Sequence, residues 1–284
     1  MRTMNRRVTR LALALLLISV GAVQAYGQDW RTVTMSRQIQ DEQTVDVEVR
    51  YGAGRLSVGP AETGTLYWIQ LRYDEEVFEP VAEYRGSTLR IGTESIGRGF
   101  RIARSRTAGE MDLKLARDIA MDLSMEFGAV RADIDLGGLR LTGLDIETGA
   151  SQTMLVVSEP NRETMDEASL EIGAAEFTAR QLGNLNASRI EVDAGLGDID
   201  LDFTGEWQRD ARVFVDMGLG ALTLRFPKGL GVRLVKDTFL TSLNSEGLVK
   251  RGEAYYSLDY DEADYRVTID VDAAFGSIRV LWVR

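Results

Sequence analysis

The sequence of 284 residues contains neither cysteine nor histidine. Without cysteine the chain forms no disulfide bond, so its stability must come from an apolar core. Without either residue, Ser-His-Asp catalysis, Cys-His catalysis and the usual zinc sites are excluded. Phosphate-binding glycine motifs are absent too, and acidic pairs are too common to indicate a glycosidase. We therefore predict a protein that is not an enzyme and that has no cofactor.

Long apolar runs are scarce, and the notable one, Leu11 to Val23, is only 13 residues long. That length is short for a membrane span. Four arginines precede the run, and Val23 and Ala25 offer the small residues that signal peptidase requires. We expect a signal peptide over residues 1–25, cleavage near Ala25, and an extracytoplasmic product, periplasmic or secreted, with no membrane span in the mature chain.

Basic residues are also few compared with acidic ones, at 33 against 44. The net charge is −11, and removal of a signal peptide with four arginines and no acidic residue leaves −15. A surface this acidic repels nucleic acids and anionic lipid headgroups. We expect no nucleic-acid partner, and the 259 residues that remain are enough to build a sizeable core.

A short phrase of sequence recurs along the chain. It takes the form Val-Asp-x-Gly-Leu-Gly at Val192 and Val215 and returns as Val-Asp-Ala-Ala-Phe-Gly at Val271. Its pivot positions are Gly52, Gly128, Gly149, Gly173, Gly195, Gly218 and Ala274. From Gly128 the steps are 21, 24, 22 and 23 residues, a period typical of stacked repeats.

Apolar residues alternate on both sides of each pivot, which is the pattern of β-strands. After three of the pivots the residues expected to face the core are Ile199, Leu201, Phe203, Leu222, Leu224, Phe226, Ile278, Val280 and Trp282. Glycine at the pivot suits a corner, because it tolerates positive φ and leaves no side chain to clash with the next coil. We predict an all-β fold: a β-solenoid or rolled β-sheet of about 22-residue repeats with glycine corners.

The expected organisation places an N-terminal layer of strands before the repeats. Its parts are a signal peptide (1–25), an N-terminal segment (26–44), the strand layer (45–94), an Arg-rich linker (95–110) and the repeat domain (111–284) with an insertion at 244–265. Four arginines in the linker suit an anionic envelope polymer, the acidic face of another copy, or simple solvation. Self-association is therefore one of the alternatives.

Two groups of residues are candidates for a binding surface. The acidic ladder comprises the carboxylates two residues before successive pivots: Glu126, Glu147, Glu171, Asp193, Asp216 and Asp272. They alternate with the core-facing residues of their strands and should therefore point outward. Such a row forms either a solvated face or a site for divalent ions.

The second group lies in the insertion and comprises Tyr255, Tyr256, Asp259, Tyr260, Asp261 and Tyr265. Aromatic rings edged by carboxylates can stack on sugars, or the tyrosines can cap the end of the solenoid. We expect Gly276 to Arg284 to form the outermost strand, with Tyr255 or Tyr256 packed against it.

The stretches from Leu113 to Val130 and from Leu136 to Ser151 resemble the bacterial toastrack family. This family is related to putative-adhesin repeats and to the C-terminal domain of cell-wall-active antibiotic response (LiaF-type) proteins. The resemblance runs from about Val45 to Val283 and carries structural motifs, with no catalytic signature. It implies an exported binding or scaffold module with a link to the envelope-stress response, although the membrane helices of LiaF-type proteins are missing here.

We therefore expect a non-catalytic envelope protein that binds an envelope component or another protein. Two alternatives stay open, namely a β-helical carbohydrate-active enzyme and an adhesin-like structural spacer. A groove with converging carboxylates would favour the enzyme, and an exposed aromatic patch would favour a binding protein.

Overall fold

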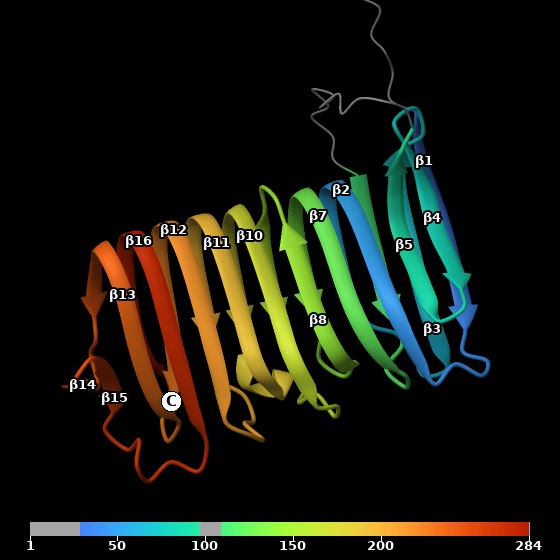
Figure 1. The fold of residues 1–284 in the computed structure, drawn as a ribbon. Coiled ribbons are helices and arrows are strands. Elements are labelled where there is room, and N and C mark those ends of the chain that lie inside the picture. Colours follow the sequence, from blue (N-terminus) through green and yellow to red (C-terminus); the bar gives the residue numbers. More distant parts are fainter. Residues whose placement is uncertain (1–28, 97–108, 284) are drawn as a thin grey trace, which may run out of the picture.

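The structure, a computed structural model, describes residues 29–96 and 109–283. The predicted signal peptide and most of the predicted linker lie outside the described residues. Within them the chain forms strands and one short 3₁₀ turn, η1 (Leu182–Leu185), and no α-helix. All sixteen strands belong to one hydrogen-bonded sheet (Figure 1). The prediction of an all-β fold is confirmed.

The strands vary widely in length, and the longest ones carry the repeats. They are β1 (Trp30–Gln38), β2 (Thr44–Pro60), β3 (Thr65–Asp74), β4 (Phe78–Arg85), β5 (Thr88–Ser95), β6 (Gly109–Leu115), β7 (Ala120–Asp135), β8 (Arg140–Thr148), β9 (Gln152–Val156), β10 (Met165–Arg180), β11 (Ala187–Asp202), β12 (Ala211–Pro227), β13 (Gly231–Asn244), β14 (Leu248–Arg251), β15 (Ala254–Ser257) and β16 (Arg266–Val283).

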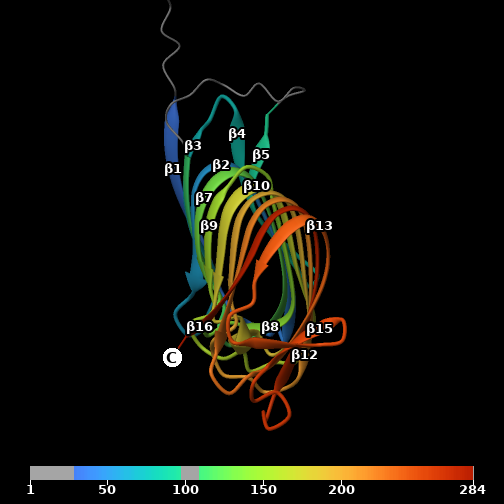
Figure 2. The same ribbon diagram turned by 90° about the vertical axis from the view of Figure 1, so that its left-hand side faces the viewer.

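Each long strand bends at its middle and forms one rung of a two-layered rack (Figure 2). We call the layer built from the half before the bend the first layer, and the other half the second layer. Strands β8 and β9 together make one rung, because β8 pairs with the first half of β10 and β9 with its second half. Neighbouring rungs are parallel and keep their register through the bend: Val192 pairs with Val215 and Ile199 with Leu222.

The C-terminal strand is not the outermost one, so that expectation is wrong. Strand β16 lies between β12 and β13, and β13 is the last rung. Val232 and Leu234 of β13 are fully buried against the core. The sequence concealed this rung because Phe239, rather than glycine, occupies the place opposite Ala274.

Additional strands cover both ends of the rack. At the C-terminal end, β15 runs antiparallel to β13, with Tyr255 opposite Leu234, and β14 extends β15. At the other end, β5 and β4 extend the first layer beyond β2, while β6, β3 and β1 extend the second. Arg37 of β1 stacks on the ring of Tyr84 of β4 at 4.0 Å, which joins the edges of the two layers.

The core lies between the layers, where the predicted inward residues are found. Leu201, Leu222 and Leu224 are fully buried, and Ile199 is 1% exposed. Phe226 stacks on Phe203 at 5.4 Å between ring centroids and contacts the ring of Trp282 at 5.6 Å. Alternation of period two therefore identified the core-facing residues correctly.

The glycines of the repeated phrase have two different roles. Positive φ occurs at the second glycine, with 148° at Gly197 and Gly220, and not at the pivot glycine as expected. A Cβ atom at Gly220 would lie 1.8 Å from the carbonyl oxygen of Gly197 on the neighbouring rung. At the pivot only close packing matters, since a Cβ at Gly218 would lie 2.5 Å from the Gly195 oxygen. Alanine is accommodated at the corresponding position 274.

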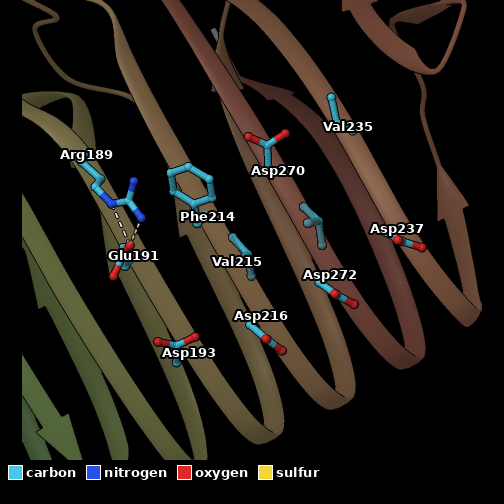
Figure 3. A pocket seen from close by; sticks show the side chains of 11 residues that line it. Arg189, Glu191, Asp193, Phe214, Val215, Asp216, Val235, Asp237, Asp270 and Asp272 are labelled. Carbon is cyan, nitrogen blue, oxygen red and sulfur yellow. Dashed lines mark hydrogen bonds and ion pairs between the residues drawn. The ribbon is translucent and has the colours of Figure 1, made fainter.

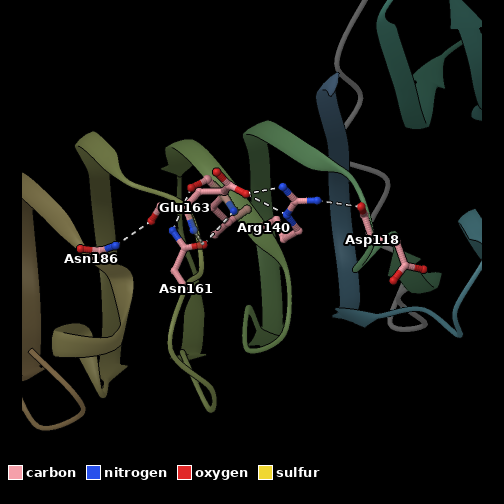
Figure 4. A network of polar contacts seen from close by, with 6 residues as sticks. Asp118, Arg140, Asn161, Glu163 and Asn186 are labelled. Carbon is pink, nitrogen blue, oxygen red and sulfur yellow. Dashed lines mark hydrogen bonds and ion pairs between the residues drawn. The ribbon is translucent and has the colours of Figure 1, made fainter. Parts of the chain in front are cut away.

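Buried asparagines join successive rungs at the end opposite the corners (Figure 4). The Asn161 side chain donates to the carbonyl oxygens of Leu141 (2.8 Å) and Leu185 (3.1 Å). Asn186 donates to the Glu163 carbonyl oxygen at 2.8 Å. These bonds satisfy backbone groups of the connecting loops, and they fix the stacking of the rungs that carry the surface described next.

Candidate functional site

The acidic ladder is continuous in the structure. Its pairs in register are Glu126 with Glu147, Glu147 with Glu171, Glu171 with Asp193, Asp193 with Asp216, and Asp216 with Asp272. All six residues are exposed and lie on the first layer, beside the corner. The repeat therefore places one carboxylate on each of six adjacent rungs.

The ladder has two neighbours that sequence reasoning missed. Asp237 of β13 pairs in register with Asp272 and adds a seventh carboxylate. Its position two residues before Phe239 follows the rule, but the missing glycine hid it. At the other end Arg50 pairs in register with Glu126, and their side chains lie 3.4 Å apart. The ladder thus begins at a cation and ends on the last rung.

A shallow depression of about 520 Å³ lies over the C-terminal half of the ladder (Figure 3). Carboxylates on four neighbouring rungs line it: Glu191, Asp193, Asp216, Asp237, Asp270 and Asp272. The Arg189 guanidinium donates to Glu191 at 2.6 Å and stacks over the Phe214 ring at 4.1 Å. One cation and one aromatic ring therefore lie among six carboxylates.

Crowding of carboxylates alters their proton affinity. Partial burial raises the pKa of Asp193 above its usual value, and the charges of Asp216 and Glu191 raise it further. Asp122, in a second acidic depression on the same layer, has its pKa raised by burial and by Asp46 and Asp145. The first layer therefore holds like charges at a cost that a cationic partner would relieve.

The carboxylates form a row and do not converge on one point. Neighbouring strands lie about 4.8 Å apart, so side chains in register repeat at about that spacing. Within residues 29–96 and 109–283, no three acidic side chains are placed to hold one metal ion. The geometry suits an extended cationic partner better than a single divalent ion.

An apolar ridge runs along the corner beside the ladder. It comprises Leu196, Leu219, Phe275 and Leu240, which lie on four adjacent rungs, and each of them pairs in register with the next. Their exposed fractions are 49%, 50%, 44% and 64%. The sequence did contain the signal, since the Leu or Phe of the recurring phrase stands between the pivot and the second glycine, but its exposure became visible only in the fold.

The tyrosines of the insertion are held largely by arginines. Tyr255 packs against the core, while Tyr256 and Tyr260 contact edge to face at 5.0 Å. Arg251 lies over Tyr256 at 5.4 Å, and Arg266 lies over Tyr260 at 5.7 Å.

The remaining candidates of the insertion are spread around this cluster. Asp261 accepts a hydrogen bond from Arg251 at 3.1 Å, Asp259 is half-buried in the following turn, and Tyr265 is exposed on the chain before β16. Backbone pairing and a hydrogen bond from Arg233 to the Tyr256 hydroxyl (3.2 Å) attach β15 to the last rung. The use of these residues as a ligand surface stays a prediction.

No helix among the described residues has the length and apolar character needed to span a membrane. Solved structures to which this chain shows some similarity include a putative cell adhesion protein from Clostridium sporogenes ATCC 15579, with a TM-score of 0.47 and 14% identity over 90% of this chain and 100% of that one. A putative adhesin from Bacteroides fragilis NCTC 9343 has a TM-score of 0.38 and 12% identity, covering 88% and 97% of the two chains. A putative lipid binding protein from Parabacteroides distasonis ATCC 8503 has a TM-score of 0.33 and 12% identity, covering 89% and 97%.

No curated protein sequence is significantly similar to this chain. The family model described as "N-terminal domain of toast_rack, DUF2154" matches residues 26–180 and 169–225. These segments include the rungs from β2 to β11 and most of β12, the corner glycines of these rungs and most of the acidic ladder. The chain therefore belongs to the toast-rack family.

Proposed function

We propose that this protein is an exported, non-catalytic module of the cell envelope that binds an envelope component through its first layer. The observation that carries the proposal is the acidic ladder, which presents one carboxylate per rung in register along the sheet. A repeated, outward-facing row suits an extended partner that makes many similar contacts. An adhesin-like or scaffolding role follows from that geometry.

Binding to isolated cell envelopes tests the proposal. The purified protein should sediment with bacterial envelope fragments, and less of it should sediment as salt is raised, because screening weakens charge contacts. Protein that stays in the supernatant at low salt contradicts the proposal. Release of soluble sugar from the fragments would favour the carbohydrate-active enzyme.

Stepwise neutralisation of the ladder separates a binding surface from a catalytic one. Asp193→Asn, Asp216→Asn and Asp272→Asn should each weaken sedimentation partly, and their effects should accumulate. A catalytic carboxylate pair would instead lose its activity with one substitution.

The link to envelope stress is a separate part of the proposal, and the toast-rack fold is its only support. Deletion of the gene should change the expression of envelope-stress reporters in the host on exposure to a cell-wall-active antibiotic. An unchanged response in the deletion strain leaves the binding role intact and removes the signalling role.

A further inference from the structure

We infer that the apolar ridge and the adjoining ladder together form a docking surface for a cationic amphipathic α-helix of a partner protein. This inference rests on the proposed function and names the chemistry of the partner. It depends on the placement of Leu196, Leu219, Phe275 and Leu240 beside Asp193, Asp216, Asp272 and Asp237.

The fold does not require large apolar side chains at the ridge. Alanine occupies the same position on other rungs, where Ala53 pairs with Ala129 and Ala174 pairs with Leu196, and all three alanines are exposed. The three leucines at the C-terminal rungs, Leu196, Leu219 and Leu240, therefore expose apolar area that the fold does not require. Contiguous exposed apolar surface with a polar rim is typical of a protein interaction site.

The rim selects the charge of the partner. Leu196 follows Asp193 by three positions, as Leu219 follows Asp216, so the Cα atoms of the ridge and of the ladder on one rung lie at most about 10 Å apart. Lysine or arginine beside an apolar stripe would pair with these carboxylates while the stripe covers the ridge. A second copy fits poorly, because apposing two ridges would bring two acidic ladders together.

The spacing of the rungs selects the shape of the partner. Ridge side chains repeat every 4.8 Å or so along the rack. An α-helix lying along the rack repeats its contact face every ~5.4 Å, whereas one face of a strand repeats every ~6.8 Å. Over the three steps from Leu196 to Leu240 the helix drifts by about 2 Å and the strand by about 6 Å. A helix about 10–12 Å in diameter also spans the gap between ridge and ladder.

Designed peptides test this inference with the purified protein. The probe is a fluorescent helix of about 14 residues with leucines at i, i+3, i+4 and i+7 and lysines beside them. One control has the same composition with leucine and lysine alternating, and a second has glutamate in place of lysine. We expect saturable binding of the lysine helix by fluorescence anisotropy, weaker at high salt, and at least about tenfold weaker binding of both controls.

Variants of the protein locate the binding site. Leu219→Ala and Leu240→Ala should each weaken the lysine helix by about tenfold. Both should fold, because alanine already stands at the corresponding position of β2, β7 and β10. Val249→Ala and Leu258→Ala, two exposed apolar residues outside the ridge, should leave binding unchanged. The inference would be overturned if the ridge variants and the two control variants weakened binding equally, or if the lysine helix did not bind at low salt.

Two further outcomes separate this inference from the proposed function. Envelope binding that falls with ladder variants but not with ridge variants overturns the inference and leaves the function standing. Binding of the lysine helix without any envelope binding overturns the proposed function and leaves the inference standing. Binding of the protein to zwitterionic lipid vesicles, lost in Leu219→Ala, would show that the ridge serves a membrane instead.

Discussion

Asp193 of β11 lies directly beside Asp216 of β12, with both side chains exposed on the first layer. Like charges in register on neighbouring strands destabilise a sheet, and each such pair costs ~0.2–1 kcal/mol. The repeat therefore places these carboxylates side by side in spite of their effect on folding. This conflict between stability and surface charge is the strongest structural reason to assign the ladder a function.

Neutralising one carboxylate of the ladder should stabilise the protein. We expect Asp193→Asn to raise the melting temperature by about 1–3 °C at pH 7. Its folded-state pKa is raised, so its charge costs stability as the pH rises above the usual value of 3.8. The gain should therefore shrink as the pH is lowered towards 3.8. Asp133→Asn, on the second layer between Ser57 and Met154, is the matched control and should change nothing.

The two glycines of a corner should differ in their tolerance of alanine. Gly220→Ala should destabilise strongly, because φ of 148° alone costs ~1–3 kcal/mol and the new Cβ meets a carbonyl oxygen. Gly195→Ala should destabilise less, because Gly195 has no positive φ and its Cβ would lie 2.9 Å from the Gly173 oxygen, against 1.8 Å for the corresponding contact at Gly220, although the neighbouring backbone must still shift. Chemical denaturation measures both variants. Equal losses would contradict the separate roles assigned to the glycines.

Two leucines of β12 provide a test of burial. Leu224 is fully buried, and Leu224→Ala should cost ~2–5 kcal/mol of unfolding free energy. Leu219 is 50% exposed on the ridge, and Leu219→Ala should change stability by less than about 0.5 kcal/mol. A large loss in Leu219→Ala would mean that the ridge is structural.

Glu42 should stabilise the N-terminal end in a pH-dependent manner. Its buried carboxylate accepts hydrogen bonds from the Gln40 backbone N–H at 2.6 Å and from Arg37 at 2.5 Å, and these contacts lower its pKa. A lowered folded-state pKa gives stability that is present above the usual value of 4.5 and lost as the pH falls below it.

Glu42→Gln should therefore lower the unfolding free energy by ~1.5–3 kcal/mol at pH 7. The difference from the unsubstituted protein should fade below pH 4.5. Glu83→Gln, in an exposed ion pair with Arg85, should have little effect at either pH. A loss in Glu42→Gln that is independent of pH would contradict the role given to its charge.

Much of the rack could be predicted because its physics is local. The alternation of apolar residues indicated which side chains face the core. The period of about 22 residues was enough to place Glu126 to Asp272 in one row, without knowledge of which strands pair. The order of the strands in the sheet was not predicted correctly at the C-terminal end. Nothing local to β16 indicates that it pairs with β12 rather than lying beyond β13, because both arrangements bury the same alternating residues. The choice depends on long-range pairing, which the period does not encode.

The ridge escaped prediction for a related reason. Leu196 lies between two glycines that the corner requires for structural reasons. Its apolar side chain therefore looked like another structural part of the same motif. Only the bend of the rung shows that Leu196 points to solvent while Ile199, three residues later, is buried. Exposure at a corner depends on where the strand turns, and alternation is interrupted there.

If the first layer is the binding face, charge-matched variants of the two layers should differ in their sedimentation with envelope fragments. One variant carries Asp193→Asn, Asp216→Asn and Asp272→Asn, and the other carries Asp133→Asn, Glu176→Gln and Asp198→Asn on the second layer. Both remove three negative charges. We expect only the first-layer variant to lose binding, by about tenfold or more. Equal binding by the two variants would contradict it.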